Sequence, residues 1–210
     1  MNRAALPLLL VLTGCGLNAH VRPVDKGTLA VEAAVGGPGL VVSGAPVPLL
    51  LSTVGARYGL VDRLDISLHT HITTLAAFKL FGLDLGLGWL VFDQKGAWPA
   101  VDLSARFYLF TDFQQAQSAA EVSASFSWLL GEHVMPYLTM TVYVDALAGT
   151  AHLAPGIGAE FRVGRFAIIP EIRWYAPETS ARGSSVQWLS PGGQGAIGLV
   201  LGGRFEPLRR

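Results

Sequence analysis

Charged residues are scarce in this sequence. Only 14% of its 210 residues are charged, whereas about 25% are charged in an ordinary globular protein. Basic and acidic side chains number 15 each, and lysine occurs only at Lys26, Lys79 and Lys95. A neutral chain with so few lysines lacks the basic surface that binds nucleic acid, so we expect no nucleic-acid partner.

Long apolar runs and helix-like spacing are missing as well. The chain is 51% hydrophobic and has a mean hydropathy of +0.44. Yet no segment reaches the ~18 consecutive apolar residues of a membrane-spanning helix. No stretch of useful length has apolar residues at helical spacing. Such a chain either buries a very apolar core or crosses a membrane with β-strands.

A second cysteine is also absent, which excludes an internal disulfide bond. The single cysteine, Cys15, ends a segment that begins with basic Arg3 and continues with a short apolar stretch from Ala4 to Leu12. This order is typical of a secretory signal peptide, which we place at residues 1–14.

The residues Leu12-Thr13-Gly14-Cys15 resemble the lipobox of bacterial lipoproteins. The resemblance implies that Cys15 becomes the lipidated first residue of the mature chain. The alternative is cleavage near Ala19, which would discard the cysteine. In lipoproteins, an aspartate directly after the cysteine often signals retention at the inner membrane. The residue here is Gly16, which fits delivery to the outer membrane.

The stretch from Leu64 to Val91 shows the pattern that dominates the rest of the chain. Apolar residues alternate with polar or small ones from Leu64 to Thr74, and again from Phe81 to Val91. A period of two is typical of a β-strand with one apolar and one polar face. Two such runs joined by a short link predict a hairpin.

The same alternation runs from Thr28 almost to the end of the chain. It predicts about ten strands, with eight as the alternative, in a closed antiparallel up-and-down transmembrane β-barrel. We therefore expect a lipidated tether at residues 15–27 and one all-β domain at residues 28–206. Pro155 and Pro170 fall inside predicted strands, where each removes an N–H from the ladder, and we expect a bulge at each.

Alternation alone does not tell which face of the barrel meets water. In a membrane barrel the apolar face contacts lipid, whereas in a lipocalin-like barrel it surrounds an apolar ligand. No predicted strand carries a charge on its apolar face, the polar faces have no lysine, and aromatic residues gather at strand ends. These features favour lipid contact. The direction of Leu83, Leu85 and Leu87 decides between the two structures.

The predicted links between strands differ in length on the two sides of the barrel. Short links lie on one side, and longer ones, including residues 36–48 and 177–194, lie on the other. Outer-membrane barrels have short periplasmic turns and longer outer loops, so we expect both chain termini in the periplasm. The loop at 177–194 is long enough to contact a partner.

Charged residues on the polar faces are expected to pair inside the barrel, because a buried charge needs a partner. Counting from the predicted turns sets His71 opposite Asp84, Asp84 opposite Arg106, and Glu121 diagonal to Arg106. The predicted lumen ion network is His71, Asp84, Arg106, Glu121, Glu160, Arg162, Glu171 and Arg173.

Two chemical alternatives use the same residues. His69 and His71 share a face near Asp84, but two imidazoles and one carboxylate are few ligands, so we expect no metal and no other cofactor. An Asp–His pair also activates water in hydrolases. Omptin proteases are similar in architecture, being ten-stranded outer-membrane barrels with Asp and His residues, but this chain has no matching omptin motif.

The sequence therefore predicts a small outer-membrane β-barrel lipoprotein with a structural, adhesive or narrow-channel role and with membrane lipid as its partner. One alternative is a lipid-anchored periplasmic lipocalin-like barrel that binds an apolar ligand. The other is an outer-membrane barrel hydrolase that uses His71 and Asp84.

Overall fold

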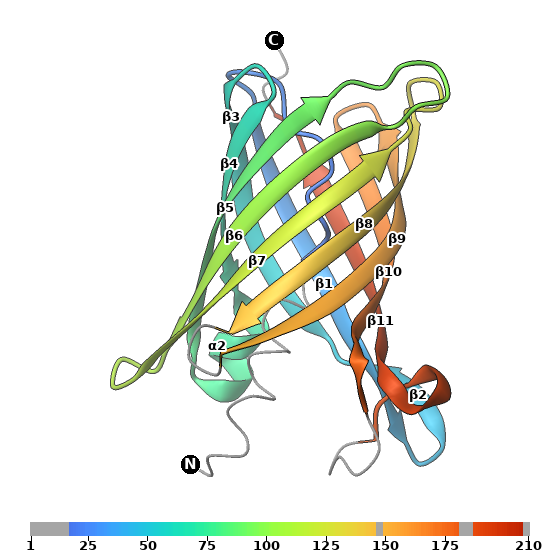
Figure 1. Ribbon diagram of the computed structural model, residues 1–210. Helices are drawn as coiled ribbons and strands as arrows, with labels where there is room; N and C mark the ends of the chain where they lie inside the picture. Colours follow the sequence, from blue (N-terminus) through green and yellow to red (C-terminus); the bar gives the residue numbers. More distant parts are fainter. Residues whose placement is uncertain (1–16, 146–148, 181–186, 208–210) are drawn as a thin grey trace.

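A computed structural model describes residues 17–145, 149–180 and 187–207 of the chain. Its strands form one antiparallel sheet whose order follows the chain and whose last strand pairs back with the first (Figure 1). Eleven strands belong to the sheet, but β2 pairs only with the far end of β1, so the closed circuit contains ten. The predicted ten-stranded all-β barrel is confirmed.

All strands of the sheet except β2 belong to the closed circuit. The strands are β1 (Leu29–Val42), β2 (Ala45–Pro48), β3 (Leu51–Val61), β4 (Leu64–His71), β5 (Phe81–Phe92), β6 (Ala100–Thr111), β7 (Ala116–Ser127), β8 (Val134–Asp145), β9 (Thr150–Val163), β10 (Phe166–Ser180) and β11 (Gln194–Phe205). A short helix, α2 (Ile72–Phe78), and a 3₁₀ turn, η2 (Pro191–Gly193), lie in the links. Among the described residues, no helix is both long and apolar enough to cross a membrane.

The apolar faces of the strands point outward. On β5, Leu85 and Leu87 are each 48% exposed, and Leu83 lies half-buried on the same face. Every strand of the circuit exposes at least one large apolar side chain: Val31, Val54, Leu68, Leu85, Leu103, Val122, Leu138, Ile157, Ile172 and Leu199. The alternate residues, such as Asp84 and Ser123, are buried. The lipocalin-like alternative is therefore wrong, because it requires the leucine face of β5 to line the interior.

The links separate the barrel into two different ends. We call the end with the turns after β3, β5, β7 and β9 the short-turn end, which is at the top of Figure 1. The opposite, long-loop end carries β2, α2 and the link from β10 to β11 (Figure 1).

Strand β4 ends at His71, although the alternation predicts a strand as far as Thr74. Threonine hydroxyls bond to backbone groups at the start of helix α2 and on the neighbouring strand β3. The Thr74 hydroxyl donates to the His71 carbonyl at 3.0 Å, and the Thr73 hydroxyl accepts the Ser52 N–H at 2.9 Å. The helix ends at Lys79, whose left-handed conformation (φ 56°) turns the chain toward β5.

Residues 36–48, expected to be a loop, are strand over most of their length. Strand β1 continues to Val42, and its hairpin with β2 projects from the long-loop end (Figure 1). Leu40 of this hairpin pairs with Trp188. The described part of the expected loop at 177–194 therefore folds onto the hairpin rather than into the lumen.

Pro155 and Pro170 cause no bulge, so that expectation is wrong. Pairing between β8 and β9 keeps one register through Pro155, and pairing between β9 and β10 has the same register on both sides of Pro170. The β9–β10 ladder instead stops before Pro155 and is interrupted beside Pro170. A local gap in one ladder removes the need for the N–H that proline lacks.

Residues 17–24 belong to the expected tether outside the barrel but lie inside it, whereas residues 25–27 are exposed at the short-turn end. Leu17 packs with Phe110 toward the long-loop end, whereas Lys26 bridges to Gly59 at the short-turn end. The chain therefore runs along the lumen before it turns into β1. Strand β11 ends at the short-turn end, so the two ends of the described chain point in opposite directions, although both were expected on one side.

Candidate functional site

The lumen segment, which we define as residues 17–28, fills the middle of the barrel. Leu17, Ala19, Val21 and Val24 are only 4 to 6% exposed. Ala19 and Val21 pack in one cluster with lumen-facing side chains of β8, notably Tyr137. The removal of these apolar side chains from water favours insertion of the segment into the barrel.

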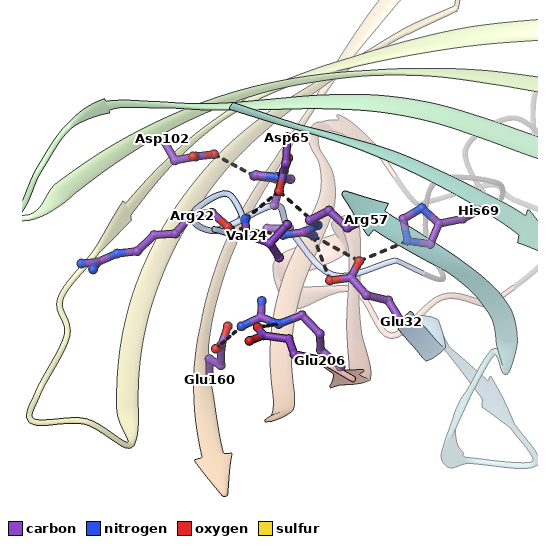
Figure 2. Close-up of polar contacts among 12 residues, drawn as sticks. Arg22, Val24, Glu32, Arg57, Asp65, His69, Asp102, Glu160 and Glu206 are labelled. Atoms are coloured by element: carbon purple, nitrogen blue, oxygen red, sulfur yellow. Dashed lines mark hydrogen bonds and ion pairs between the residues drawn. The ribbon is translucent and has the colours of Figure 1, made fainter. Parts of the chain in front are cut away.

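His20 is the central polar residue of the lumen segment. Its Nδ1 lies 2.9 Å from Asp102 Oδ1, and its Nε2 lies 2.7 Å from Asp65 Oδ1. The ring is 2% exposed, and the two carboxylates come from β6 and β4 (Figure 2). Asp65 also accepts the backbone N–H of Val24 at 2.9 Å. One carboxylate thus binds both a side chain and the backbone of the segment.

The backbone of the segment is bonded to the wall at further points, one of which is the Arg22 carbonyl, which accepts from Arg57 Nη1 at 3.4 Å. The N–H of Ala19 donates to the Glu171 carboxylate at 2.8 Å. The hydroxyl of Ser125 donates to the carbonyl of His20, also at 2.8 Å. These bonds satisfy polar groups that would otherwise be buried without partners.

Arg22 connects the segment to the short-turn end. Its Nε donates to the Ser127 hydroxyl at 2.9 Å, and its Nη2 donates to Gln94 Oε1 at 3.0 Å. Gln94 in turn accepts the N–H of Leu129 at 2.6 Å. Arg22 therefore contacts the end of β7 and the β5–β6 link, and through Gln94 it is connected to the β7–β8 link.

Glycines on the lumen face make room for the segment. A side chain at Gly88 of β5 would overlap the imidazole of His20, and one at Gly202 of β11 would overlap the side-chain amide of Asn18. The small residues on the polar faces of these strands thus provide space for residues 18 and 20.

A row of charged side chains continues from His20 across the barrel (Figure 2). Arg57 lies between two carboxylates, with Nε 3.7 Å from Asp65 Oδ2 and Nη2 3.2 Å from Glu32 Oε1. Glu32 Oε2 is 3.1 Å from His69 Nε2, and Nδ1 of the same ring is 3.1 Å from Asp84 Oδ1. The row connects the lumen segment to β1, β3, β4 and β5.

Asp84 joins this row to the residues selected from the sequence. Its Oδ2 is 3.3 Å from His71 Nε2, its Oδ1 is 3.7 Å from Arg106 Nε, and Arg106 Nη1 is 3.6 Å from Glu121 Oε1. The predicted register is wrong at all three places. On β4 the residue directly opposite Asp84 is His69, on β6 it is Tyr108 rather than Arg106, and Glu121 is directly opposite Arg106. The early end of β4 explains the error in the first hairpin.

The remaining selected residues form two other groups. Arg173 Nη2 is 2.5 Å from Glu171 Oε1, and both side chains are fully buried. Glu160 Oε1 is 2.5 Å from Arg162 Nε and equally close to Nη2 of Arg204. Arg204, on β11, was not selected from the sequence.

The wall of the lumen holds more carboxylates than guanidinium groups. The buried or half-buried charged residues of the described strands are the acids Glu32, Asp65, Asp84, Asp102, Glu121, Glu160 and Glu171 and the arginines Arg57, Arg106, Arg162, Arg173 and Arg204. His20 and Arg22 of the lumen segment face this excess of negative charge. The segment therefore complements the wall in charge as well as in shape.

Little free space remains around the middle of the lumen segment, whereas a hollow of about 400 Å³ opens beside Arg22 and Gln94 at the short-turn end. A cavity of about 20 Å³ lies between the segment and the wall, with Glu32, Arg57, His69 and Arg204 among the residues that line it. This volume is sufficient for about one water molecule. The site is thus a filled, ion-paired interior.

The His71–Asp84 pair has the surroundings of a filled interior rather than of a hydrolase site. Both side chains are buried, and the His71 ring packs edge-on against Phe110 with 4.9 Å between ring centroids. Asp84 is shared with His69 and Arg106. Within the part of the chain that the structure describes, no group of three or more His, Cys, Asp or Glu side chains could hold a metal ion.

Five central residues of the site were missed at the level of sequence: His20, Glu32, Arg57, Asp65 and Asp102. Glu32, Asp65 and Asp102 lie on the polar faces of alternating strands, so the pattern that selected Asp84 also applied to them. His20 has no such signal, because residues 16–27 show no periodicity.

The fold and the site together define a class: a closed ten-stranded antiparallel barrel with an apolar exterior and a charged, filled lumen. No family model matches the chain, and no curated protein matches it. Distant similarities to solved barrels exist, but at such low identities and TM-scores they transfer no function.

Three solved structures illustrate these similarities. The translocator domain of the autotransporter NalP from Neisseria meningitidis is 11% identical, the match covering 96% of this chain and 94% of that one with a TM-score of 0.47. An outer-membrane channel from Pseudomonas putida F1 is 8% identical, with coverages of 90% and 99% and a TM-score of 0.45. The NanC porin is 9% identical, with coverages of 84% and 98% and a TM-score of 0.44.

The buried ion pairs yield a test of the packed lumen. Arg173→Met leaves the buried Glu171 without its charged partner and should lower the free energy of unfolding by about 3–5 kcal/mol. Asp93→Asn breaks the Arg63–Asp93 pair, in which the side chains are 49% and 50% exposed, and should cost at most about 1 kcal/mol. Urea titration of the folded protein in detergent micelles measures both, and equal losses would contradict a packed lumen.

Proposed function

We propose that the protein is an outer-membrane β-barrel that acts as a narrow channel and is held closed in the described conformation. The observation that carries the proposal is the inverted distribution of residues: large apolar side chains outside, ion pairs inside. Lipid is the medium that accepts such an exterior. Exposed aromatic residues support it, with Trp89 and Phe166 toward the short-turn end and Phe113 in the β6–β7 link at the long-loop end, as expected at the two membrane interfaces.

The lumen segment favours a channel over a purely structural barrel. About eight strands give an interior that side chains just fill, and this barrel has ten. Its wall side chains leave room for a separate stretch of backbone, which occupies the lumen in their place. The structural role remains the second candidate, because the many paired charges also stiffen the barrel. An adhesive role would depend on the long-loop end, where Trp188 packs onto the β1–β2 hairpin.

We further propose that the signal peptide is removed before Cys15 and that this cysteine is lipidated. Cleavage near Ala19 would remove Leu17 and Asn18, although Leu17 is buried and Asn18 donates from its side chain to the Ile169 carbonyl at 2.9 Å. Only one residue, Gly16, separates Cys15 from the buried Leu17, so the membrane leaflet that receives the lipid depends on where the segment leaves the lumen.

The lipid-facing exterior can be tested by charge insertion. Leu85→Arg puts a guanidinium near the middle of the outward face, and we expect it to lower the free energy of unfolding in a bilayer by about 2–4 kcal/mol. Leu60→Arg, also outward-facing and 42% exposed but near the short-turn end, should cost only about 0–1 kcal/mol. Denaturant titration in liposomes measures both variants. A Leu85→Arg protein as stable as wild type, or a wild-type protein recovered without detergent from the soluble periplasm, would contradict the membrane assignment.

The mature N-terminus can be read by mass spectrometry of the protein from the membrane fraction. We expect the first peptide to begin at Cys15 and to carry the mass of a diacylglyceryl group, which Cys15→Ser should abolish. A mature chain that begins at His20 would show that the lipobox is not used.

Orientation can be measured on intact cells with a membrane-impermeant maleimide. We propose that the short-turn end is periplasmic. The Gln114→Cys variant, at an exposed position of the β6–β7 loop, should then be labelled from outside. The Glu132→Cys variant, exposed between β7 and β8, should be labelled only after the outer membrane is permeabilised. The opposite pattern would reverse the assigned orientation.

A further inference from the structure

We propose that the lumen segment, residues 17–28, is a displaceable plug and that its withdrawal opens a cation-preferring pore. The inference rests on the proposed channel function and specifies its gate and its selectivity. The plug is residues 17–28, and the permeating species are small monovalent cations.

The barrel does not need the segment in order to close. Strand β1 pairs with β11 from Val31 to Pro38 and with β3 from Leu29 to Gly36. The segment adds an isolated bridge from Lys26 to Gly59, in which Gly59 exchanges backbone hydrogen bonds with Gly27 and Thr28 at the short-turn end. All other described contacts of residues 17–25 with the wall are packing contacts or single polar contacts, so the segment can leave without breaking the hydrogen-bonded ring.

The wall is shaped around the segment. The nearest atoms to a side chain at Gly88 all belong to the His20 ring, and the nearest to one at Gly202 all belong to Asn18. Neither position would meet another wall residue first. These two glycines therefore leave space that only the segment fills, and the space is released when it withdraws.

The seated segment is not fully relaxed. Arg22 adopts a left-handed backbone conformation with φ 61°, which is strained for a residue with a side chain. The second carboxylate oxygen of Asp102 is buried and has no hydrogen-bond partner among the described residues. Both features lower the free-energy difference between the seated and withdrawn segment, as a reversible plug requires.

Charge determines what an open lumen would pass. In the described strands the wall carries two more buried or half-buried carboxylates than guanidinium groups. Its two buried imidazoles, His69 and His71, face Glu32 and Asp84, and the segment supplies His20 beside Asp65 and Asp102. When the segment withdraws, Asp102 loses its ion-pair partner and Asp65 keeps only Arg57. A lumen with excess negative charge concentrates cations and repels anions.

The decisive experiment is single-channel recording of the full-length protein in planar bilayers under a KCl gradient. Gly88→Ala inserts a methyl group where the His20 ring lies and should displace the plug. We expect frequent openings where wild type is almost always closed, with a reversal potential shifted toward the potassium equilibrium value. The matched control is Gly86→Ala on the same strand and face, whose nearest neighbours are Ser67 and Arg106 of the wall, and it should stay closed like wild type.

A second pair of variants separates the contacts that hold the plug in place from the ion selectivity of the pore. His20→Ala removes both contacts to the carboxylates and should open the pore while keeping its cation preference. Asp102→Asn should also increase opening, but with a reversal potential shifted back toward zero because the wall has lost a negative charge. An open pore that prefers chloride would overturn the assigned selectivity.

Folding must be checked in each variant, so that the two proposals fail separately. Heat-dependent gel mobility and protease resistance in liposomes report an inserted, folded barrel. If Gly88→Ala and His20→Ala both insert and fold but conduct no more than wild type, the plug is disproved and the membrane barrel stands. If wild type itself does not insert into bilayers, the proposed function fails.

Discussion

A strand that faces lipid finds no water to satisfy its backbone, so the ladder from β1 to β11 must close on itself. The pairing of Val31 with Phe205 through Pro38 with Gly198 completes that ring. Everything else follows from this closure. It turns one face of every strand outward and the other inward, and it encloses a space whose width depends on the strand number. Prolines are tolerated only where one ladder can stop locally, as it does beside Pro170.

The enclosed space creates the second requirement, which is charge pairing. Polar side chains that face inward are removed from water, and a buried charge is stable only beside its counterpart. Arg57, between Asp65 and Glu32, and Arg173, against Glu171, meet this requirement within the wall. Asp102 does not, because its partner is His20 of the lumen segment. The wall and the segment therefore depend on each other, and this dependence is the physical basis of the proposed plug.

Much of the barrel can be predicted from the sequence because a period of two is a local property. The outward direction of Leu85 and Leu87 and the inward direction of Asp84 and Arg106 follow from alternation once the exterior is recognised as apolar. Register was predicted less well. His71 was set opposite Asp84, but His69 holds that place, because β4 ends at His71 and α2 occupies the link to β5. A hairpin link of unknown conformation leaves the register unspecified by one or two residues.

The sequence by itself determined the strands, the direction of their apolar faces outward and polar faces inward, and the presence of inward charges. Each of these depends on residues adjacent in the chain. Only the tertiary structure decided what fills the lumen. Residues 17–28 have no periodicity, and their place depends on Asp65, Asp102 and Glu171, which come from three strands distant in sequence. Gly88 illustrates the same limit of sequence reasoning. The need for glycine at this position becomes apparent only when the structure places the His20 ring against it.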